Sequence, residues 1–381
     1  MNLLDKLRSI ESKPREAPKP APVPERTCYV KHITRDLSEF PGCFSVTADL
    51  LNLMWKEQLP QDLHPTEILY LDTETTGLGG GAGTLAFEIG IGRLTESGFH
   101  IDQYVMRDYP EELPMLTCIR EKLLQSRAIC TFNGRAFDIP LLRSRFVMNR
   151  LRPDVLDLPH IDLLPIARRL WKMRLNRCTL SHLEEEILGI QRHGDLPGSE
   201  APKRFFDYLK TGEFTLLEDV LFHNEQDVAS MCTLLARMAH DYDRPERIVH
   251  QEDLFSMGLA LEKERHQERA RTVYRMVPSG KLHGKSQAHL AKSHMRGGEI
   301  EESVCIWLSM VERREGGIEP MVELAKYYEH RAGDLREALR WTEKAILTAS
   351  EPSMDTGAMQ DTLLSLQYRY DRLRRRLDVL T

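Results

Sequence analysis

Short apolar runs with strand-like spacing lie in the first half of the chain. Residues 66–72 (TEILYLD) form a compact apolar run that is typical of a buried strand. Residues 87–94 and 99–106 follow, the second with alternating apolar and polar positions, and the turn residues 96–98 separate them. Three strands joined by short connections predict an antiparallel meander.

After these strands, the apolar positions follow the spacing of helices. The pattern predicts a helix near 111–126, a short strand over 128–132 that ends at Asn133-Gly134, and a helix in the segment FDIPLLRSRFVMNR that follows. Further helices are expected over 161–174, 179–188, 201–210 and 214–240. Three antiparallel strands, a crossover helix and a further strand flanked by helices predict an α/β domain, which we expect to end near Asp243.

Beyond about residue 250 the strand signals end and an internal period of 33 to 34 residues begins. Small residues recur at this period, and a second small residue with an aromatic three or four positions later completes each unit. The members are Gly258, Ala270 and Tyr274; Ala291, Ser303 and Trp307; and Ala325, Ala338 and Trp341. Such a period matches tetratricopeptide repeats, each a helix–turn–helix, and an unrelated helical bundle is the alternative.

Composition narrows the class of protein. The 381 residues exceed one typical domain, and 41% hydrophobic with 29% charged residues describes a soluble globular chain. No run approaches the roughly 18 apolar residues of a membrane span, and the first residues lack the apolar core of a signal peptide. Seven dispersed cysteines without a CxxC pair argue against a zinc site or a disulfide framework. We therefore expect a cytoplasmic protein with no membrane partner.

The charge distribution is uneven. The net charge is -6, but residues 120–178 contain 13 Lys and Arg against 5 Asp and Glu. The contributors include Arg135, Arg143, Arg145, Arg168, Arg169, Lys172 and Arg174. These side chains either form an ordinary solvated face or line a groove that tracks phosphates, so nucleic-acid binding through one basic face stays open.

Two carboxylates stand at the end of the first predicted strand, in the sequence Asp72-Thr73-Glu74. Side chains two residues apart on a strand share a face, so Asp72 and Glu74 point the same way. Two unpaired carboxylates side by side repel each other unless a cation bridges them. Their hard oxygens suit Mg²⁺ or Mn²⁺, whereas a solvated acidic pair is the plain alternative.

Further candidates follow along the chain. Asp138 comes after the predicted strand 128–132, near the start of a helix, where an aspartate can also simply favour the positive end of the helix dipole. His223 and Asp227 are four residues apart and project from one helix face, as a surface pair also would. Four acids and a histidine at a strand end, a helix start and a late helix form a more specific pattern than any of them alone.

The segments LDTETTG, FNGRAFD and HNEQDV resemble the three exonuclease motifs of the DEDD (DnaQ-like) superfamily, which has a ribonuclease H-like fold. The longer stretches GLGGGAGTLAF, TFNGRAFDIPLLRSRF, PHIDLLPIARRLW, DLPGSEAP and HNEQDVASM resemble YprB-type ribonuclease H-like exonuclease domains. The resemblance runs from about Thr66 to Met238. It implies an α/β ribonuclease H-like domain with a mixed sheet flanked by helices, and members of this group are often followed by tetratricopeptide-like helices.

The resemblance also implies roles for single residues. Asp72, Glu74, Asp138 and Asp227 would hold two Mg²⁺ or Mn²⁺ ions, and His223 would orient or deprotonate the attacking water. The implied reaction is 3′–5′ exonucleolytic hydrolysis of phosphodiester bonds in DNA or RNA. The third motif departs from the superfamily, because its spacing follows the tyrosine class while its side chain is a histidine.

Several neighbours complete the candidate site. Thr75 and Thr76 lie where enzymes of this superfamily contact the terminal nucleotide, Asn133 either caps a helix or binds substrate, and Arg135 is a substrate-side cation. Asp162 matches a recurrent aspartate outside the ligand set and is expected to have a supporting role, as a helix N-cap or behind the ligands. The glycine-rich run 79–84 either approaches a phosphate or is a flexible loop.

These observations predict five regions: a proline-rich arm (1–27), a lead-in segment (28–65), the nuclease domain (66–243), tetratricopeptide-like all-α repeats (250–350) and a capping helix (351–381). The repeats could bind a protein partner. The alternative to a nuclease is therefore an adaptor, in which a weakly active or inactive nuclease fold recruits a partner through its repeats.

Overall fold

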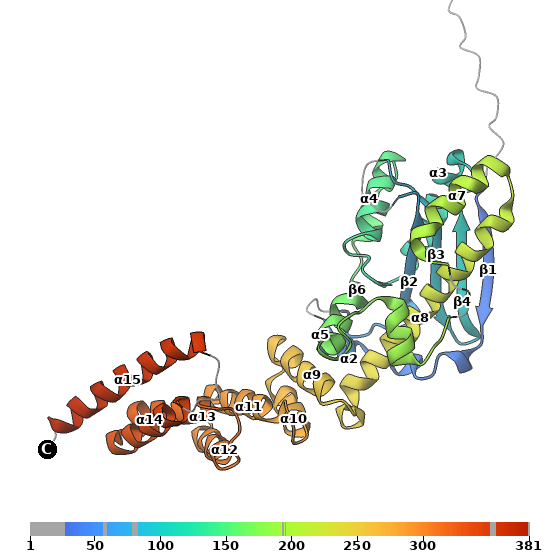
Figure 1. Cartoon of the computed structure of the whole chain (residues 1–381). Coiled ribbons are helices and arrows are strands. Elements are labelled where there is room, and N and C mark those ends of the chain that lie inside the picture. Colours follow the sequence, from blue (N-terminus) through green and yellow to red (C-terminus); the bar gives the residue numbers. More distant parts are fainter. Residues whose placement is uncertain are drawn as a thin grey trace, which may run out of the picture.

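The computed structural model describes residues 27–55, 59–77, 83–192, 194, 196–350 and 356–379. The proline-rich arm expected up to residue 27 and most of the glycine-rich run after Gly77 lie outside these ranges. Figure 1 shows a domain of strands and helices followed by an elongated region of helices. An α/β domain followed by an all-helical region, as the sequence predicts, is confirmed.

The sheet has six strands in the order β1-β4-β3-β2-β5-β6. They are β1 (Tyr29–Arg35), β2 (Ile68–Thr75), β3 (Ala86–Thr95), β4 (Gly98–Val105), β5 (Ala128–Thr131) and β6 (His160–Asp162). The strands β2, β3 and β4 form the antiparallel meander that the pattern predicts, and β5 joins β2 in parallel. The sheet is therefore mixed.

The sequence reasoning missed the two outer strands. β1 lies in the lead-in segment and pairs antiparallel with β4, and β6 pairs parallel with β5 where a helix had been expected to begin. β1 carries charged and exposed positions because it is an edge strand, and β6 has only three residues, too few to show a period. The lead-in segment therefore belongs to the sheet domain.

Helices cover both faces of the sheet. They are α2 (Ala48–Met54), α3 (Glu112–Leu124), α4 (Asp138–Met148), α5 (Leu163–Leu175), α6 (Leu180–Leu183), α7 (Ala201–Thr211) and α8 (Glu218–Asp243). Because side chains alternate along β2, Leu69 and Leu71 pack in the core with α3 and α4, while Tyr70 packs in the core with α5 and α8. Asp72 has the same parity as Tyr70, so it lies on the face that α8 covers.

The C-terminal region consists of paired helices. They are α9 (Gln251–Lys263), α10 (Gln267–Met276), α11 (His283–Gly297), α12 (Ile300–Glu312), α13 (Glu319–Tyr327), α14 (Leu335–Ala349) and α15 (Thr356–Asp378). Periodic small residues lie where these helices touch: a Cβ on Gly258 would lie 2.4 Å from the Tyr274 ring, and Ala291 packs with Trp307. In α15, Arg372 pairs with the buried Glu329 at 2.7 Å.

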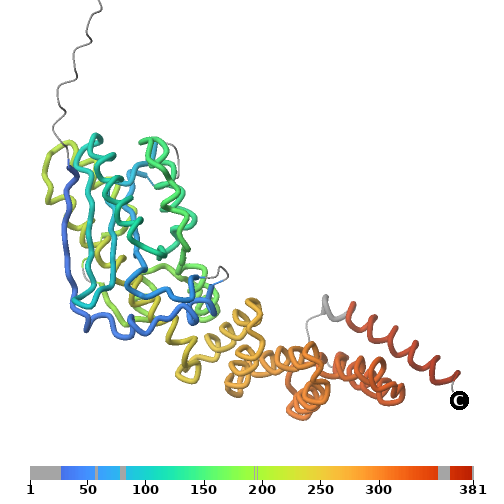
Figure 2. Tube along the Cα trace, turned by 180° about the vertical axis from the view of Figure 1, so that it is seen from behind, coloured from blue at the N-terminus to red at the C-terminus, as the bar shows by residue number. Residues whose placement is uncertain are grey.

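The helical region is joined to the sheet domain by a shared core. In both views the row of helices extends from one end of the sheet domain (Figures 1 and 2). Leu254 and Phe255 of α9 belong to the same core cluster as Trp171 of α5 and residues of α8. Arg169 pairs with Glu264 at 2.8 Å, and Arg174 donates to Asp253 at 3.0 Å. Among the described residues, no helix has both the length and the apolar composition that crossing a membrane requires.

We predict that the sheet domain needs α9 for its stability. A chain that ends at Asp243 exposes the core surface that Leu254 and Phe255 cover, and we expect this to lower the free energy of unfolding by on the order of 3 kcal/mol. A chain that ends at Gly317 keeps α9 to α12 and serves as the control. Urea unfolding curves of the two chains that coincide would contradict the shared core.

Candidate active site

Four carboxylates come together where β2 meets α4 and α8. Asp72 and Glu74 lie on β2, Asp138 is the first residue of α4, and Asp227 lies within α8. Burial, followed by repulsion from Asp227, Asp138 and Glu74, raises the pKa of Asp72 well above its usual range. The other three acids singled out in the sequence therefore lie close enough to Asp72 to repel its charge.

Asp138 is held by the neighbouring strand residue. The Thr73 hydroxyl donates to Asp138 Oδ1 at 2.5 Å, from the face of β2 opposite to Asp72. Burial raises the pKa of Asp138 to about 6, although the hydrogen bond from Thr73 opposes the rise. Burial in the fold thus makes ionisation of the Asp138 carboxyl group less favourable than in water.

A buried chain of amides supports Asp72. Asn224 Nδ2 donates to Asp72 Oδ2 at 3.0 Å, and Gln103 Nε2 donates to Asn224 Oδ1 at 3.2 Å and to Glu88 Oε1 at 2.9 Å. Asn224 fits because Gly90 lies beneath it: a Cβ at Gly90 would lie 2.0 Å from Asn224 Oδ1. The glycine is therefore required for the amide that orients Asp72.

Glu88 is a fifth acid that the sequence reasoning missed. Its side chain is 1% exposed, and within the described part of the chain its Oε2 has no hydrogen-bond partner. Burial and then the charge of Asp72 raise its pKa well above the usual range. The sequence does contain an indication of Glu88, because it is a charged residue within the otherwise apolar strand segment AFEIGIG.

His223 faces the acids with one nitrogen and an arginine with the other. Its Nε2 lies 3.9 Å from Glu74 Oε1 and 3.7 Å from Asp227 Oδ2, and its Nδ1 lies 3.3 Å from Arg192 Nη1. A guanidinium only donates hydrogen bonds, so Nδ1 is the acceptor in this contact and the ring proton lies on Nε2. The histidine therefore presents an N–H to the carboxylates.

Arg192 is the second residue that the sequence reasoning missed. Its guanidinium donates to both carboxylate oxygens of Glu184 at 2.5 Å and also pairs with Asp227. Glu184 is completely buried, so this ion pair anchors the segment after α6 beside the acids. No sequence pattern marked Arg192, because the contact joins segments 35 residues apart.

The donor set has the chemistry of a divalent-cation site. Four carboxylates supply hard oxygens, and their repulsion at Asp72 is what a bound cation would relieve. Among the described residues, however, no three His, Cys, Asp or Glu side chains are placed to hold one ion together. Three of the acids instead have protein partners: Asn224 donates to Asp72, Thr73 donates to Asp138 and Arg192 pairs with Asp227.

The two threonines of the first motif fix the turn that follows β2. Thr75 Oγ1 donates to the Gly77 carbonyl at 2.8 Å, and Thr76 Oγ1 accepts from Leu85 N at 3.0 Å. Both hydroxyls therefore stabilise the local backbone in this structure, at the edge of the acid cluster.

Asp162 organises the turn between β5 and α4. It caps α5 by accepting from Leu164 N, and it also accepts from the backbone N–H groups of Asn133 and Arg135, at 2.8 and 3.1 Å. Asn133 has a left-handed φ of 67°. Asn133 thus contributes its backbone to this turn, which leads the chain toward Asp138.

Most residues of the basic cluster make contacts within the fold. Arg135 stacks on Trp55 at 5.0 Å and donates to the His160 carbonyl at 3.2 Å. The other ion pairs are Arg143 with Asp157, the buried Arg145 with Glu112, Arg169 with Glu264 and Arg174 with Asp253. These four ion pairs give the arginines a role in the fold, and a phosphate-tracking groove stays a prediction.

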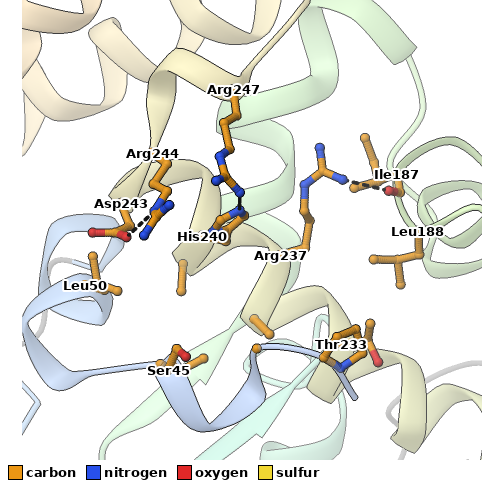
Figure 3. A pocket seen from close by; sticks show the side chains of 15 residues that line it. Ser45, Leu50, Ile187, Leu188, Thr233, Arg237, His240, Asp243, Arg244 and Arg247 are labelled. Atoms are coloured by element: carbon orange, nitrogen blue, oxygen red, sulfur yellow. Dashed lines mark hydrogen bonds and ion pairs between the residues drawn. The ribbon is translucent and has the colours of Figure 1, made fainter. Parts of the chain in front are cut away.

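A hollow of about 570 Å³ lies at the C-terminal end of α8 (Figure 3). Figure 3 shows Arg237 donating to the Ile187 carbonyl at 3.2 Å and Arg247 bonded to His240 at 3.3 Å. Cations at this end of a helix offset the negative end of its dipole. His240 is 13 residues beyond Asp227, about 20 Å along the helix, so the hollow is separate from the acid cluster.

Comparison with known proteins agrees with the sheet domain. Residues 69–239 match the family described as the RNase_H superfamily, so this region is a ribonuclease H-like domain. The chain is 29% identical over 346 residues to YprB of Bacillus subtilis (strain 168), which is described as uncharacterized. That match covers 87% of this chain and 83% of YprB.

Two solved structures show weaker likeness. A family B DNA polymerase from the hyperthermophilic archaeon Pyrobaculum calidifontis has a TM-score of 0.36 at 11% identity, over 60% of this chain and 28% of the polymerase. Apo exonuclease I has a TM-score of 0.28 at 14% identity, over 81% of this chain and 97% of the enzyme. Both TM-scores lie below 0.5, so the fold assignment rests on the family match and the sheet.

We predict that Asp138→Asn stabilises the metal-free protein at neutral pH. The pKa of Asp138 is about 6 in the folded protein against a usual 3.8, so stability is lost as the pH rises from about 4 through 6. The variant should gain on the order of 2 kcal/mol at pH 8 and little at pH 4. Urea unfolding in EDTA measures this, with the exposed Asp154→Asn as control; a gain that does not grow with pH would contradict it.

We also predict that Arg192 and Glu184 stabilise the fold only as a pair. Arg192→Met leaves the fully buried Glu184 unpaired and should lower the free energy of unfolding by about 3 kcal/mol. Adding Glu184→Gln removes the buried charge and should recover most of that loss. Chemical denaturation of both single variants and the double variant measures the coupling, and additive effects would show that the pair is not coupled.

Proposed function

We propose that this protein is a metal-dependent nuclease that hydrolyses phosphodiester bonds of DNA or RNA, working from the 3′ end. One observation carries the proposal: Asp72, Glu74, Asp138 and Asp227 converge at one edge of a ribonuclease H-like sheet. Buried acids that repel one another destabilise a fold, so their concentration is better explained by a cation than by packing. The exonuclease direction follows from the resemblance of the three motifs to DEDD exonucleases.

Asp72, Glu74, Asp138 and Asp227 would hold two Mg²⁺ or Mn²⁺ ions. When bound, the ions supply an activated water and stabilise the leaving oxygen. The chain prepares the ligands for this: Asn224 orients Asp72, and Thr73 orients Asp138. Arg192 must release Asp227, or share it, when a cation is present, because its guanidinium occupies one carboxylate oxygen.

His223 acts in this proposal by orienting the attacking water. Its Nε2–H points to the side where Glu74 and Asp227 lie, and its Nδ1 accepts from Arg192. A histidine in this tautomer donates a hydrogen bond at Nε2 and cannot take a proton there. The contact with Arg192 therefore favours a positioning role over that of a general base.

We further propose that α9 to α14 are three tetratricopeptide-like repeats that offer a surface to a protein partner. Support comes from the helix pairs and from the periodic small and aromatic residues at their contacts, such as Gly258 against Tyr274. On the alternative view, the adaptor, this recruitment is the main task and the acids do not catalyse.

We predict metal-dependent loss of nucleotides from the 3′ end. Single strands of RNA and DNA, labelled at either end, should be shortened stepwise in Mn²⁺ or Mg²⁺ and remain intact in EDTA. Asp72→Asn and Asp227→Asn should each lower the rate at least about 100-fold, because each removes a charged ligand oxygen. The exposed Asp154→Asn should cleave like the natural chain.

Thermal unfolding with added Mg²⁺ separates the possible causes of a negative result. A rise in Tm that Asp227→Asn abolishes shows that the acids bind the ion, because binding to the folded state stabilises it. Metal binding without cleavage of any strand would leave the adaptor as the better account. If the protein shows no metal binding and cleaves no strand, the nuclease proposal is overturned.

A further inference from the structure

A shallow groove of about 580 Å³ runs along α7, beside the acid cluster. It is lined by Gly77, Ser199, Pro202, Lys203, Phe206, Asp207 and Lys210. The groove adjoins the site at two points. Gly77 follows Glu74 by three residues, and Gly198 lies so near His223 that a Cβ there would be 3.5 Å from Nε2.

An aromatic ring stands at the surface of this groove. Phe206 is 40% exposed, and its ring lies 6.1 Å from that of Phe205. Phe205 is fully buried and stacks on Phe87 of β3, with centroids 4.3 Å apart and planes within 11°. Phe206 is thus the exposed end of an aromatic row that begins at Phe87 in the sheet.

Two ammonium groups flank the ring. Lys203 precedes Phe206 by three residues and Lys210 follows it by four, so all three lie on one side of α7, and both lysines are exposed. The lysines are seven residues apart, about 10 Å along the helix. Asp207 also lines the groove and pairs with Lys210 at 3.2 Å, which leaves Lys203 as the stronger attraction for an anion.

We propose that this groove binds a single strand of nucleic acid, with one base stacked on Phe206 and the adjoining phosphates at Lys203 and Lys210. An exposed aromatic ring between cations is the arrangement that proteins use for single strands without sequence preference. Cations are also needed here because the nearby acids repel a polyanion. The inference rests on the proposed function, since it names the path by which the strand reaches the acids.

Binding without cleavage tests the groove. Fluorescence anisotropy of a labelled 12-nucleotide strand is measured with the full chain carrying Asp72→Asn, in Mg²⁺. Adding Phe206→Ala should weaken binding about tenfold while the dependence on salt stays the same, because stacking involves no phosphate. Phe206→Trp should retain the affinity. Phe44→Ala is the matched control, since Phe44 is 41% exposed but lies outside the groove.

The lysines give a second, independent readout. For a single strand, each phosphate neutralised contributes about 0.7 to the slope of log K against log salt. Lys203→Ala with Lys210→Ala should therefore reduce the slope by about 1.4, whereas Lys285→Ala with Lys326→Ala, outside the groove, should leave it unchanged.

The outcomes separate this inference from the proposed function. If the natural chain degrades strands but Phe206→Ala and the lysine variant bind as tightly as their controls, strand binding in this groove is contradicted and the nuclease activity is supported. If binding depends on Phe206 and the lysines but the natural chain cleaves no strand with any metal, the strand-binding groove is supported and the nuclease activity is contradicted. If no strand binds at all, the groove is overturned.

Discussion

The site depends on one electrostatic constraint: four carboxylates share a partly buried edge of a sheet. Burial and then repulsion from the other three acids raise the pKa of Asp72 well above its usual range, and burial raises the pKa of Asp138 to about 6. A fold accepts such a cost only where other interactions compensate for it. The hydrogen bonds from Asn224 and Thr73 and the ion pair with Arg192 contribute to that compensation.

The same partners give the site its shape. Asn224 is held between Asp72 and Gln103, above a glycine that leaves room for its amide, and Gln103 in turn reaches Glu88. The amides of this network hold Asp72 in place, while Glu88 at its far end has one oxygen without a hydrogen-bond partner among the described residues. Arg192 differs from the other partners, because it is itself a cation and competes for the oxygen that a metal would need. In the proposed chemistry Arg192 would either release Asp227 or share its carboxylate with the ion.

The helical region shares a core with the sheet domain. α8 carries Asp227 near its middle and, through its C-terminal half, packs in the same cluster as α9. The ion pairs of Arg169 and Arg174 close this junction from α5. A partner bound to the helices would therefore be held at a defined position relative to the site, rather than through a free linker.

The sequence by itself determined whatever depends on short spacing. The two-residue separation puts Asp72 and Glu74 on one face, the apolar runs define the meander, and the 34-residue period marks the helix contacts at Gly258 and Tyr274. Only the tertiary structure decided which distant residues meet. β1 and β6 are strands because they pair with neighbours in the sheet. The contact of Arg192 with Asp227 depends on the packing of the segment after α6 against α8, which no local sequence pattern indicates. The arginines of residues 120–178 look alike in sequence, and only the structure shows that Arg145, Arg169 and Arg174 pair with carboxylates far along the chain. A charge pair depends on distance in space and not along the chain.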